Sequence, residues 1–338
     1  MWKARAILPI LILASGCRIA PEAATQTDLT FQRGAQLLAT GSPKTAIPLL
    51  TQVVASVPDG PEPHAMLSLA YALDLQSERA IAQAAQVKRK PGEPPGWERM
   101  AVGIAELARG RPGEAVRQFD DVKAQVAPEG PMSIAISQWL ILALLLQEDH
   151  QRALELLDEL ALSPAGTTAL LWRVLVYSRQ GETEKAVQAL TAVAGDVAVP
   201  RPAPVNMGQK ATDHMLYDAA ISALRDGNLD EAEEIFADLQ QRHPRAFDAP
   251  AWLALIAAAG GDWPTARSRL DEAQMLGSMQ SRGIAHQLHG VVCAMERMPE
   301  QVVRAMVVGQ RLLGRGSSPA HAVTQPKRDR VWFSDAMN

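Results

Sequence analysis

Small and apolar positions recur along this chain at intervals close to 34 residues. Further apolar columns lie twelve and nine residues before each of these positions and four residues after it, spacings at which residues share one face of a helix. The pattern predicts eight pairs of helices of about a dozen residues each. The small residue marks the second helix of each pair, and this rung column consists of Ala46, Ala80, Ala115, Ala153, Ala186, Ala232, Ala266 and Val302.

Small side chains at the rungs allow stacked helices to approach closely, because a large side chain at the crossing would hold them apart. The residues four positions after the rungs are mostly large and apolar: Leu50, Ala84, Phe119, Leu157, Leu190, Phe236, Leu270 and Met306. We therefore expect Ala232→Leu or Ala266→Leu to overpack the stack and to destabilise it.

Glycine and proline residues that end helices recur at fixed distances from the rungs. Five repeats carry a glycine five residues before the rung, where it can take the left-handed conformation that ends a helix: Gly41, Gly110, Gly181, Gly227 and Gly261. Prolines near the repeat ends are expected to stop the second helices: Pro58, Pro91, Pro128, Pro164 and Pro244. Two independent sets of breakers thus support the same division into helix pairs.

The repeat length, the small rungs and the large residues four positions later resemble the tetratricopeptide repeat. The resemblance implies an all-α fold, a right-handed α-solenoid of about eight TPR-like helix-turn-helix repeats. Residues 29–194 would form repeats 1–5 and residues 212–313 repeats 6–8, with a disordered tail at 314–338. Such arrays bind partners along a concave face that is lined by their first helices.

One interval between rungs is too long for a single repeat. Ala186 and Ala232 are 46 residues apart, and the intervening segment 195–211 contains Pro200, Pro202 and Pro204. This composition predicts a stiff loop or linker. It is either a surface insertion in one continuous solenoid or a hinge between a block of five repeats and a block of three.

Two columns on the first helices, eleven and eight residues before the rungs, are almost entirely apolar. Their resemblance to the concave face of the family implies a groove that receives an amphipathic or hydrophobic segment of a partner protein. The alternative is that a tight superhelix, or the tail of the chain itself, covers them. The expected partner-binding residues are Leu38, Leu69, Ile104, Leu107, Leu142, Leu145, Leu175, Ile221, Leu224, Leu255 and Val291.

The first helix of the eighth pair offers an alternative, a metal site. His286, His289 and Cys293 follow one another at i, i+3 and i+7, a spacing that puts three ligands for zinc or copper on one face. The same face is required for packing in this repeat, and packing is the preferred interpretation. No cofactor is expected. Lys88, Arg89 and Lys90 form a basic run that we expect to be the solvated end of a second helix.

The N-terminus has the features of an export signal. Lys3 and Arg5 precede an apolar run that is too short to span a bilayer, and small residues then lead into Cys17. This arrangement resembles the lipobox of bacterial lipoproteins, which implies a signal peptide at 1–16, lipidation of Cys17 and a polar tether at 17–28. Because Arg18 replaces the aspartate of the family's inner-membrane retention signal, the resemblance implies the outer membrane, facing the periplasm.

Composition narrows the classes of function. The net charge of −4 and the pI of about 6.0 give no sign of nucleic-acid binding, which usually requires a strong basic field. If Cys17 is acylated, only Cys293 remains and no intramolecular disulfide can form. The sequence contains no nucleophile elbow, zinc-protease motif, phosphate loop or dinucleotide fingerprint, so we expect no enzyme.

These features together predict a membrane-anchored scaffold for protein partners in the cell envelope. The chain resembles tetratricopeptide lipoproteins that pilot secretins in pilus and secretion systems, that serve outer-membrane protein assembly, or that regulate wall-remodelling enzymes. The regulator differs from the scaffold only in what the partner does. A metal-handling lipoprotein that uses His286, His289 and Cys293 is the alternative from a different class.

Overall fold

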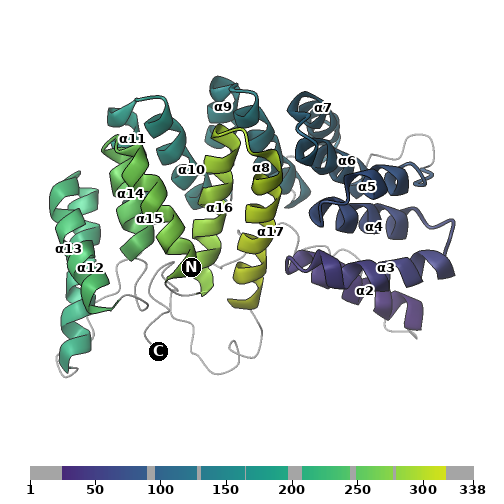
Figure 1. The fold of residues 1–338 in the computed structure, drawn as a ribbon, viewed down its shortest axis with the longest axis horizontal. Helices are drawn as coiled ribbons and strands as arrows, with labels where there is room; N and C mark the ends of the chain where they lie inside the picture. The colour runs from purple at the N-terminus through teal and green to yellow at the C-terminus, as the bar shows by residue number, and fades with distance from the viewer. Residues whose placement is uncertain are drawn as a thin grey trace. The chain divides into compact units, whose positions relative to one another are not determined.

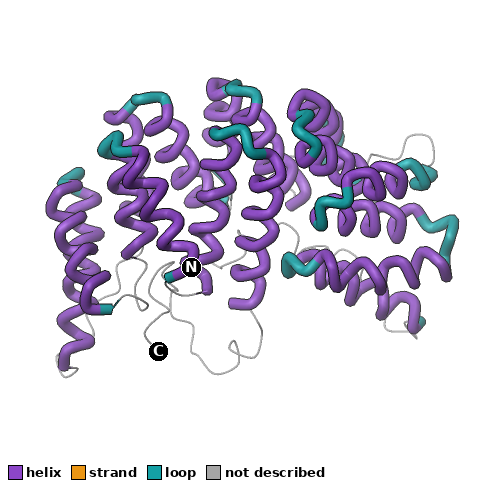
Figure 2. The backbone as a smooth tube through the Cα atoms, viewed as in Figure 1, coloured by secondary structure: helices purple, strands orange, loops and turns teal. Residues whose placement is uncertain are grey.

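The structure, a computed structural model, describes residues 25–89, 96–127, 131–163, 165–196, 208–243, 249–276 and 279–316. Within these ranges the regular structure is entirely helical: sixteen helices, α2 to α17, and no strand (Figures 1 and 2). The predicted all-α class is thereby confirmed.

The helices follow one another as eight pairs, as the periodicity predicted. The first helices of the pairs are α2 (Gln26–Ala39), α4 (Pro61–Leu73), α6 (Trp97–Ala108), α8 (Pro131–Leu146), α10 (Gly166–Arg179), α12 (Gly208–Arg225), α14 (Ala249–Ala259) and α16 (Met279–Met295). The second helices are α3 (Pro43–Ser56), α5 (Ser77–Ala84), α7 (Pro112–Lys123), α9 (His150–Ala161), α11 (Thr183–Asp196), α13 (Leu229–Arg242), α15 (Trp263–Met275) and α17 (Pro299–Gly316).

Every rung is the fourth residue of its second helix, as the bounds of α3 to α17 show. Its backbone N–H donates the first hydrogen bond of that helix, for example from Ala80 to the carbonyl of Gln76 and from Val302 to that of Met298. All eight rungs are buried, with Ala266 the most exposed at 3%. The rung column is thus buried in the packing between helices, as the pattern predicted.

The small residues twelve positions before the rungs make room for the large residues four positions after them. A Cβ atom placed on Gly34 would lie 2.8 Å from Leu50, and one placed on Gly103 would lie 2.4 Å from the ring of Phe119. In the second repeat Ser68 takes this position, and its hydroxyl donates to the carbonyl of Ala80 over 2.8 Å. The two predicted columns therefore pack against each other within a pair.

The turn between the two helices of a pair has a left-handed residue in all eight repeats. The five predicted glycines have φ between 63° and 83°. The three repeats without glycine keep the same conformation with an ordinary residue, at Leu75, Glu148 and Arg297. In each turn the residue after the left-handed one donates its N–H to a carbonyl of the first helix, in the Schellman pattern. Gln76, for example, donates to the carbonyl of Tyr71. The geometry of the turn is therefore independent of glycine.

A left-handed non-glycine residue costs about 1–2 kcal/mol, which gives a prediction for Leu75 with φ of 61°. Leu75→Gly and Leu75→Ala both remove the side chain, but only glycine relieves the strain. We expect the glycine variant to have the higher free energy of unfolding by about 1 kcal/mol, measured by denaturant titration. The reverse order, which is normal inside helices, would contradict this account of the turn.

The chain divides into two compact units. Unit I contains residues 25–156 and 293–315 of the described chain, and unit II contains residues 157–292. In unit I the helices from α2 to α8 stack in sequence order, each first helix against its own partner and against the next pair. The last helix, α17, belongs to this unit although it is far from α2 in the sequence.

The order of stacking changes in unit II. Helix α14 of the seventh repeat packs directly on α10 and α11 of the fifth repeat (Figure 1). The guanidinium of Arg179 lies 5.6 Å from the ring centre of Trp263 across the same contact. A strictly sequential solenoid would place repeat 6 there, so the sequence did not predict this arrangement. Repeats on both sides of segment 195–211 lie in one unit, and the role of the segment as an insertion or a hinge stays a prediction.

Several features predicted from the sequence lie in segments outside the described residues. Cys17 and residues 17–24 of the tether, most of the segment 195–211 and residues 317–338 are not described. The predicted boundary of the tether at residue 28 is wrong, because α2 begins at Gln26 and Thr25 caps it. Helix α11 continues to Asp196, α12 begins at Gly208 and α17 continues to Gly316, past the predicted end of the last repeat at 313.

The basic run near residue 89 differs from its predicted role. Helix α5 already ends at Ala84, so the run lies beyond the helix. Arg89 forms two hydrogen bonds with the carboxylate of Glu98, of 2.7 and 2.8 Å, and only 19% of its side chain is exposed. The N–H of Gly96 donates to the same carboxylate. The prediction of a solvated helix end is wrong for Arg89, which instead fastens the loop to the start of α6.

Candidate functional site

The predicted partner groove is closed in the structure. All eleven residues are buried, with none more than 2% exposed: Leu38, Leu69, Ile104, Leu107, Leu142, Leu145, Leu175, Ile221, Leu224, Leu255 and Val291. The prediction of an open groove at these positions is therefore corrected in favour of the alternative that the packed array covers them.

The physical reason is that neighbouring helices pack against these columns of the first helices. Helix α4 contacts α2, α3, α5 and α6. In α8 every residue from Ser133 to Leu146 is buried. The apolar columns at eleven and eight residues before the rungs thus supply contacts between helices, and a partner must dock on another surface.

The residues of the metal alternative are engaged in other contacts. Cys293 is fully buried, and its thiol lies 3.8 Å from the amide oxygen of Gln301. His289 lies 3.4 Å from the carboxylate of Asp271. Over the part of the chain that the structure describes, no group of three His, Cys, Asp or Glu side chains has the geometry to hold a metal ion. Packing is thus the interpretation that the contacts favour.

His286 shares this helix and is partly buried. Burial lowers its pKa from 6.5 to about 4, and the positive charges of His289 and Arg282 contribute in the same direction. Between these two pH values the unfolded chain binds a proton at this residue that the folded chain does not. The contribution of His286 therefore destabilises the fold as the pH falls from 6.5 towards 4.

We expect His286→Gln to lose less stability than the wild type between pH 6.5 and pH 4. The difference should be about 1 kcal/mol after a reduction for the solvent-exposed part of the ring. Thermal denaturation at both pH values measures it, with pH 7.5 as the internal control, where no such difference is expected. An equal loss in both proteins would contradict the shift.

A different surface is built from the turns of the first four repeats. Their left-handed residues are Gly41, Leu75, Gly110 and Glu148, and we call the surface that they mark the turn edge. Helix α17, within the same unit, lies along this edge (Figure 1). The segment that begins with the turn before α17 meets the four turns in reverse sequence order. Arg297 of that turn pairs with Glu148 at 2.5 Å, whereas Arg311 near the end of α17 reaches Gly41.

The end of α17 makes the closest contacts with the turn edge. The side chain of Gln310 donates to the carbonyl of Ala39 over 3.1 Å, and Nε of Arg311 donates to the carbonyl of Gly41 over 2.8 Å. A Cβ atom on Gly41 would lie 2.6 Å from the backbone nitrogen of Arg311. Glycine at this turn therefore serves two purposes, the left-handed conformation and the close approach of α17.

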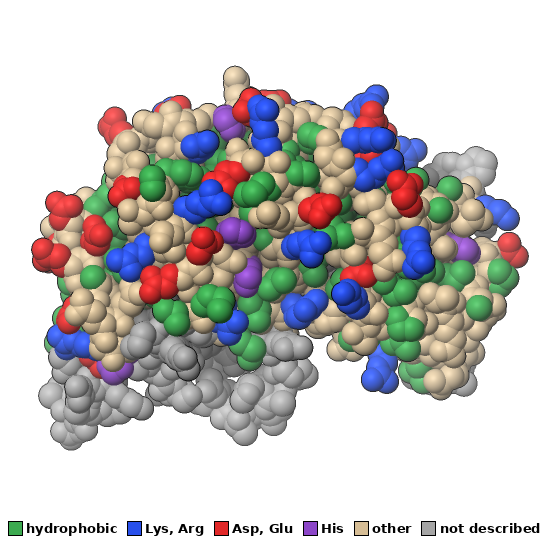
Figure 3. Space-filling view, viewed as in Figure 1, with side chains coloured by type: hydrophobic (Ala, Val, Ile, Leu, Met, Phe, Trp, Pro, Cys, Tyr) green, Lys and Arg blue, Asp and Glu red, His purple; other side chains and the backbone are tan. Residues whose placement is uncertain are grey.

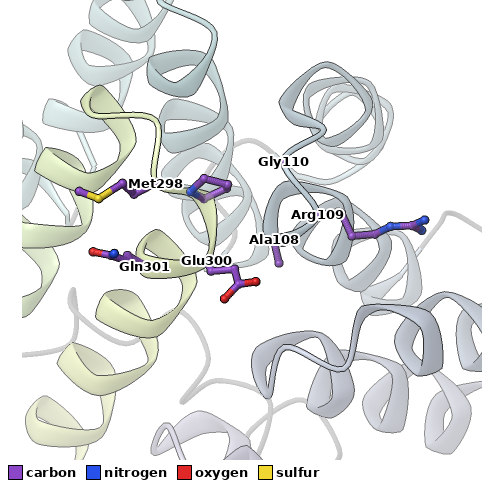
Figure 4. Close-up of a pocket in the computed structure, with 7 residues that line it drawn as sticks. Ala108, Arg109, Gly110, Met298, Glu300 and Gln301 are labelled. Carbon is purple, nitrogen blue, oxygen red and sulfur yellow. The ribbon is translucent and has the colours of Figure 1, made fainter.

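Two open surface depressions lie along α17 on the turn edge. One, of about 410 Å³, is lined by the turn around Gly110 and by Met298 to Gln301 (Figure 4). In this view Glu300 points towards Ala108, whereas Arg109 points away from α17. The other, of about 380 Å³, lies between the turn around Leu75 and the segment from Arg304 to Arg311. Side chains of α17 and of the turns thus line the same depressions.

The turn edge has no single sign of charge. The carbonyl ends of α2, α4, α6 and α8 meet the amide ends of α3, α5, α7 and α9 at its turns, so partial negative and partial positive charges oppose one another there. Lys44 and Asp74 both line the depression at the turn around Leu75, and Arg304 of α17 pairs with Glu300 of the same helix over 3.7 Å. On the face shown in Figure 3, acidic and basic side chains are likewise interspersed.

None of the described helices is long and apolar enough to cross a membrane. Attachment through Cys17 falls outside the described residues and stays a prediction.

The tetratricopeptide repeat family model matches residues 100–167 and 217–277, in agreement with the helical repeats. No curated protein matches the sequence. Among solved structures, the chain is similar to a tetratricopeptide repeat protein from Parabacteroides merdae ATCC 43184, with 14% identity over 86% of this chain and 98% of that chain and a TM-score of 0.33. It is also similar to a chain in the structure of the APC/C hetero-tetramer Cut9-Hcn1, with 13% identity over 87% of this chain and 56% of that chain and a TM-score of 0.38.

Proposed function

We propose that this protein is a non-enzymatic scaffold for protein partners, anchored in the cell envelope through lipidated Cys17. The observation that carries the proposal is the α-solenoid of paired helices, with tetratricopeptide matches in both units. Solenoids of this kind offer long surfaces assembled from successive repeats, and such surfaces suit the binding of extended partners.

The envelope assignment rests on the sequence of the first seventeen residues. A positive start, a short apolar run and small residues before Cys17 support export and lipidation, and Arg18 supports the outer membrane. Assembly or stabilisation of a secretin, pilus, secretion or outer-membrane machine is the role that suits a tethered scaffold of this kind.

The buried first-helix columns change where the partner would dock. Because they lie in the core, the partner would bind side chains that the packed array leaves exposed.

Fractionation of the native host tests the anchor. Cys17→Ser should move the protein from the membrane fraction to the soluble fraction, whereas the control Cys293→Ala should leave it membrane-bound. If Cys17→Ser remains as membrane-bound as the wild type, the lipid anchor is wrong.

Crosslinking in the same host, followed by mass spectrometry, tests the scaffold. The expected result is a reproducible set of crosslinks to one or a few envelope proteins, reduced when Cys17→Ser removes the anchor. Crosslinks to no protein above the level of an unrelated lipoprotein control would reject the scaffold.

A further inference from the structure

We infer that the open end of the first helix pair docks on the surface of the bilayer that anchors Cys17. The open end consists of the start of α2, residues 25–29, and the end of α3 with the residue that follows it, residues 55–57. It lies opposite the turn at Gly41, which joins the two helices. The inference rests on the proposed lipid anchor, and it adds which part of the scaffold faces the membrane.

Two apolar side chains, Leu29 and Val57, are exposed at the open end. A Cβ atom on Gly34 of α2 would lie 2.8 Å from the side chain of Leu50 in α3, which aligns the two antiparallel helices. From these residues, the chain back to Leu29 and the chain on to Val57 lead to the same end of the pair. Leu29 is 50% exposed and Val57 is 41% exposed. Among the described residues of unit I, these are the two large hydrophobic side chains that are exposed.

The tether joins the folded chain at the open end. Thr25 caps α2, so eight residues, Cys17 to Ala24, connect the lipidated cysteine to it. Fully extended, they span at most about 28 Å. The tether therefore keeps Leu29 and Val57 close to the bilayer, at a high effective concentration. Docking then needs only a small gain from burying these two side chains, because the acyl chains already supply the affinity for the membrane.

The charged groups of the open end are compensated. The carboxylate of Asp28 accepts hydrogen bonds from the N–H and the hydroxyl of Thr25, of 3.0 and 2.7 Å, and lies at the positive end of the α2 dipole. Asp59, just beyond α3, lies 3.7 Å from Lys88. The other residues of the open end are uncharged. Contact with a bilayer therefore removes no isolated charge from water.

The outer side of α2 is polar beyond its first turn. Leu29 precedes its rung by seventeen residues, a register position that is buried in repeats with a pair before them, as Ile136, Ala169, Ala249 and Ala285. The next two positions on this side are buried in repeat 4 as Leu140 and Ala143, but in α2 they are the exposed Arg33 and Gln36. A partner pair or a second copy that stacked along α2 would bury both polar side chains. A bilayer surface meets the end alone, so it is the occupant that fits.

The test compares two positions on α3 in the lipidated full-length protein. The protein is purified from host membranes, its acylation is verified by mass, and it is reconstituted into vesicles of phosphatidylethanolamine and phosphatidylglycerol with a nitroxide lipid as quencher. An environment-sensitive fluorophore is attached to Ser56→Cys at the open end or, as the matched control, to Thr45→Cys near the turn. Both positions are exposed, whereas Cys293 is buried. They are about 16 Å apart along the helix. We expect at least twofold quenching at position 56 and little at position 45.

Two substitutions distinguish docking from simple tethering. Leu29→Glu with Val57→Glu should bring the quenching at position 56 down to the level at position 45, while the acyl chains keep the protein on the vesicles. The control, Thr45→Glu with Thr51→Glu, adds the same charge at exposed positions nearer the turn. It should leave the quenching at position 56 unchanged.

Equal quenching at positions 56 and 45, or quenching at position 56 that survives Leu29→Glu with Val57→Glu, would overturn the inference. A change in fluorescence at position 56 that depends on protein density would identify a second copy as the occupant. A change that occurs in host membranes but not in pure lipid vesicles would identify a protein partner. Either of these results would also overturn it.

The comparison of positions 56 and 45 needs no charged variant, so it stays decisive if Leu29→Glu with Val57→Glu unfolds by circular dichroism. If the purified protein carries no acyl chains on Cys17, the anchor and the docking fail together. If it is acylated and the quenching is equal at the two positions, the docking alone fails. The anchored scaffold then still stands.

Discussion

Gly41→Ala is expected to lower the free energy of unfolding by about 3 kcal/mol, the larger of the two glycine effects in these turns. Two costs combine at this residue. Its φ of 63° disfavours a side chain by about 1–2 kcal/mol. A Cβ atom would in addition lie 2.6 Å from the backbone nitrogen of Arg311 and 2.7 Å from the carbonyl oxygen of Val307. Because both are backbone atoms of a helix, they cannot rotate away, and overpacking of this kind costs about 1–3 kcal/mol.

Gly227→Ala is the matched control. Gly227 has a similar φ of 75°, but no atom lies within 4 Å of the position of a Cβ. It should lose only the conformational part, about 1–2 kcal/mol. Denaturant titration gives both values, and hydrogen exchange of α17 should increase only in Gly41→Ala. Equal losses in the two variants would show that α17 does not approach the first turn closely.

Ala80→Leu is expected to destabilise the protein by about 3 kcal/mol, because three further carbon atoms must enter a crossing that is already filled. Ala80 is fully buried, and its carbonyl accepts the hydroxyl of Ser68 from the facing helix. A leucine there would push α4 away from α5 and strain that hydrogen bond. Ala232→Leu, at the fully buried rung of the sixth repeat, should give a loss of similar size.

Ala82→Leu provides the control within the same helix. Ala82 lies two residues after the rung and is exposed. Because alanine and leucine differ little in helix propensity, this variant should change the free energy of unfolding by less than about 0.5 kcal/mol. Thermal denaturation of both variants makes the comparison. If Ala80→Leu is as stable as Ala82→Leu, the rung does not mark a close crossing.

The repeat pattern in the sequence describes features that are local to each helix pair. The rungs, the small residues facing them and the turn glycines are local features, repeated within each pair of about 34 residues. Gly103 and Phe119 belong to one pair and illustrate this, since the fit of one against the other follows from their spacing alone. The left-handed turns at Leu75, Glu148 and Arg297 were missed because their only signal was the register of the neighbouring repeats.

The candidate site was less predictable than the fold. Leu38 and Ile104 were correctly identified as members of two apolar columns, but apolar character alone does not distinguish an open groove from a core. Exposure depends on which helices lie against the column, and that depends on the packing of successive pairs. The basic run around Arg89 likewise did not indicate that Arg89 pairs with Glu98, on the far side of a loop.

The sequence by itself determined the helices of this protein, their pairing and the positions at which they cross, because helical periodicity and steric fit between near neighbours act over a few tens of residues. Only the tertiary structure decided that α14 packs on α10 and α11, that the first-helix columns are closed, and that α17 lies on the turns of repeats 1–4. The 270 residues between Gly41 and Arg311 leave no periodic signal. Contacts over such separations result from small rotations that accumulate from pair to pair.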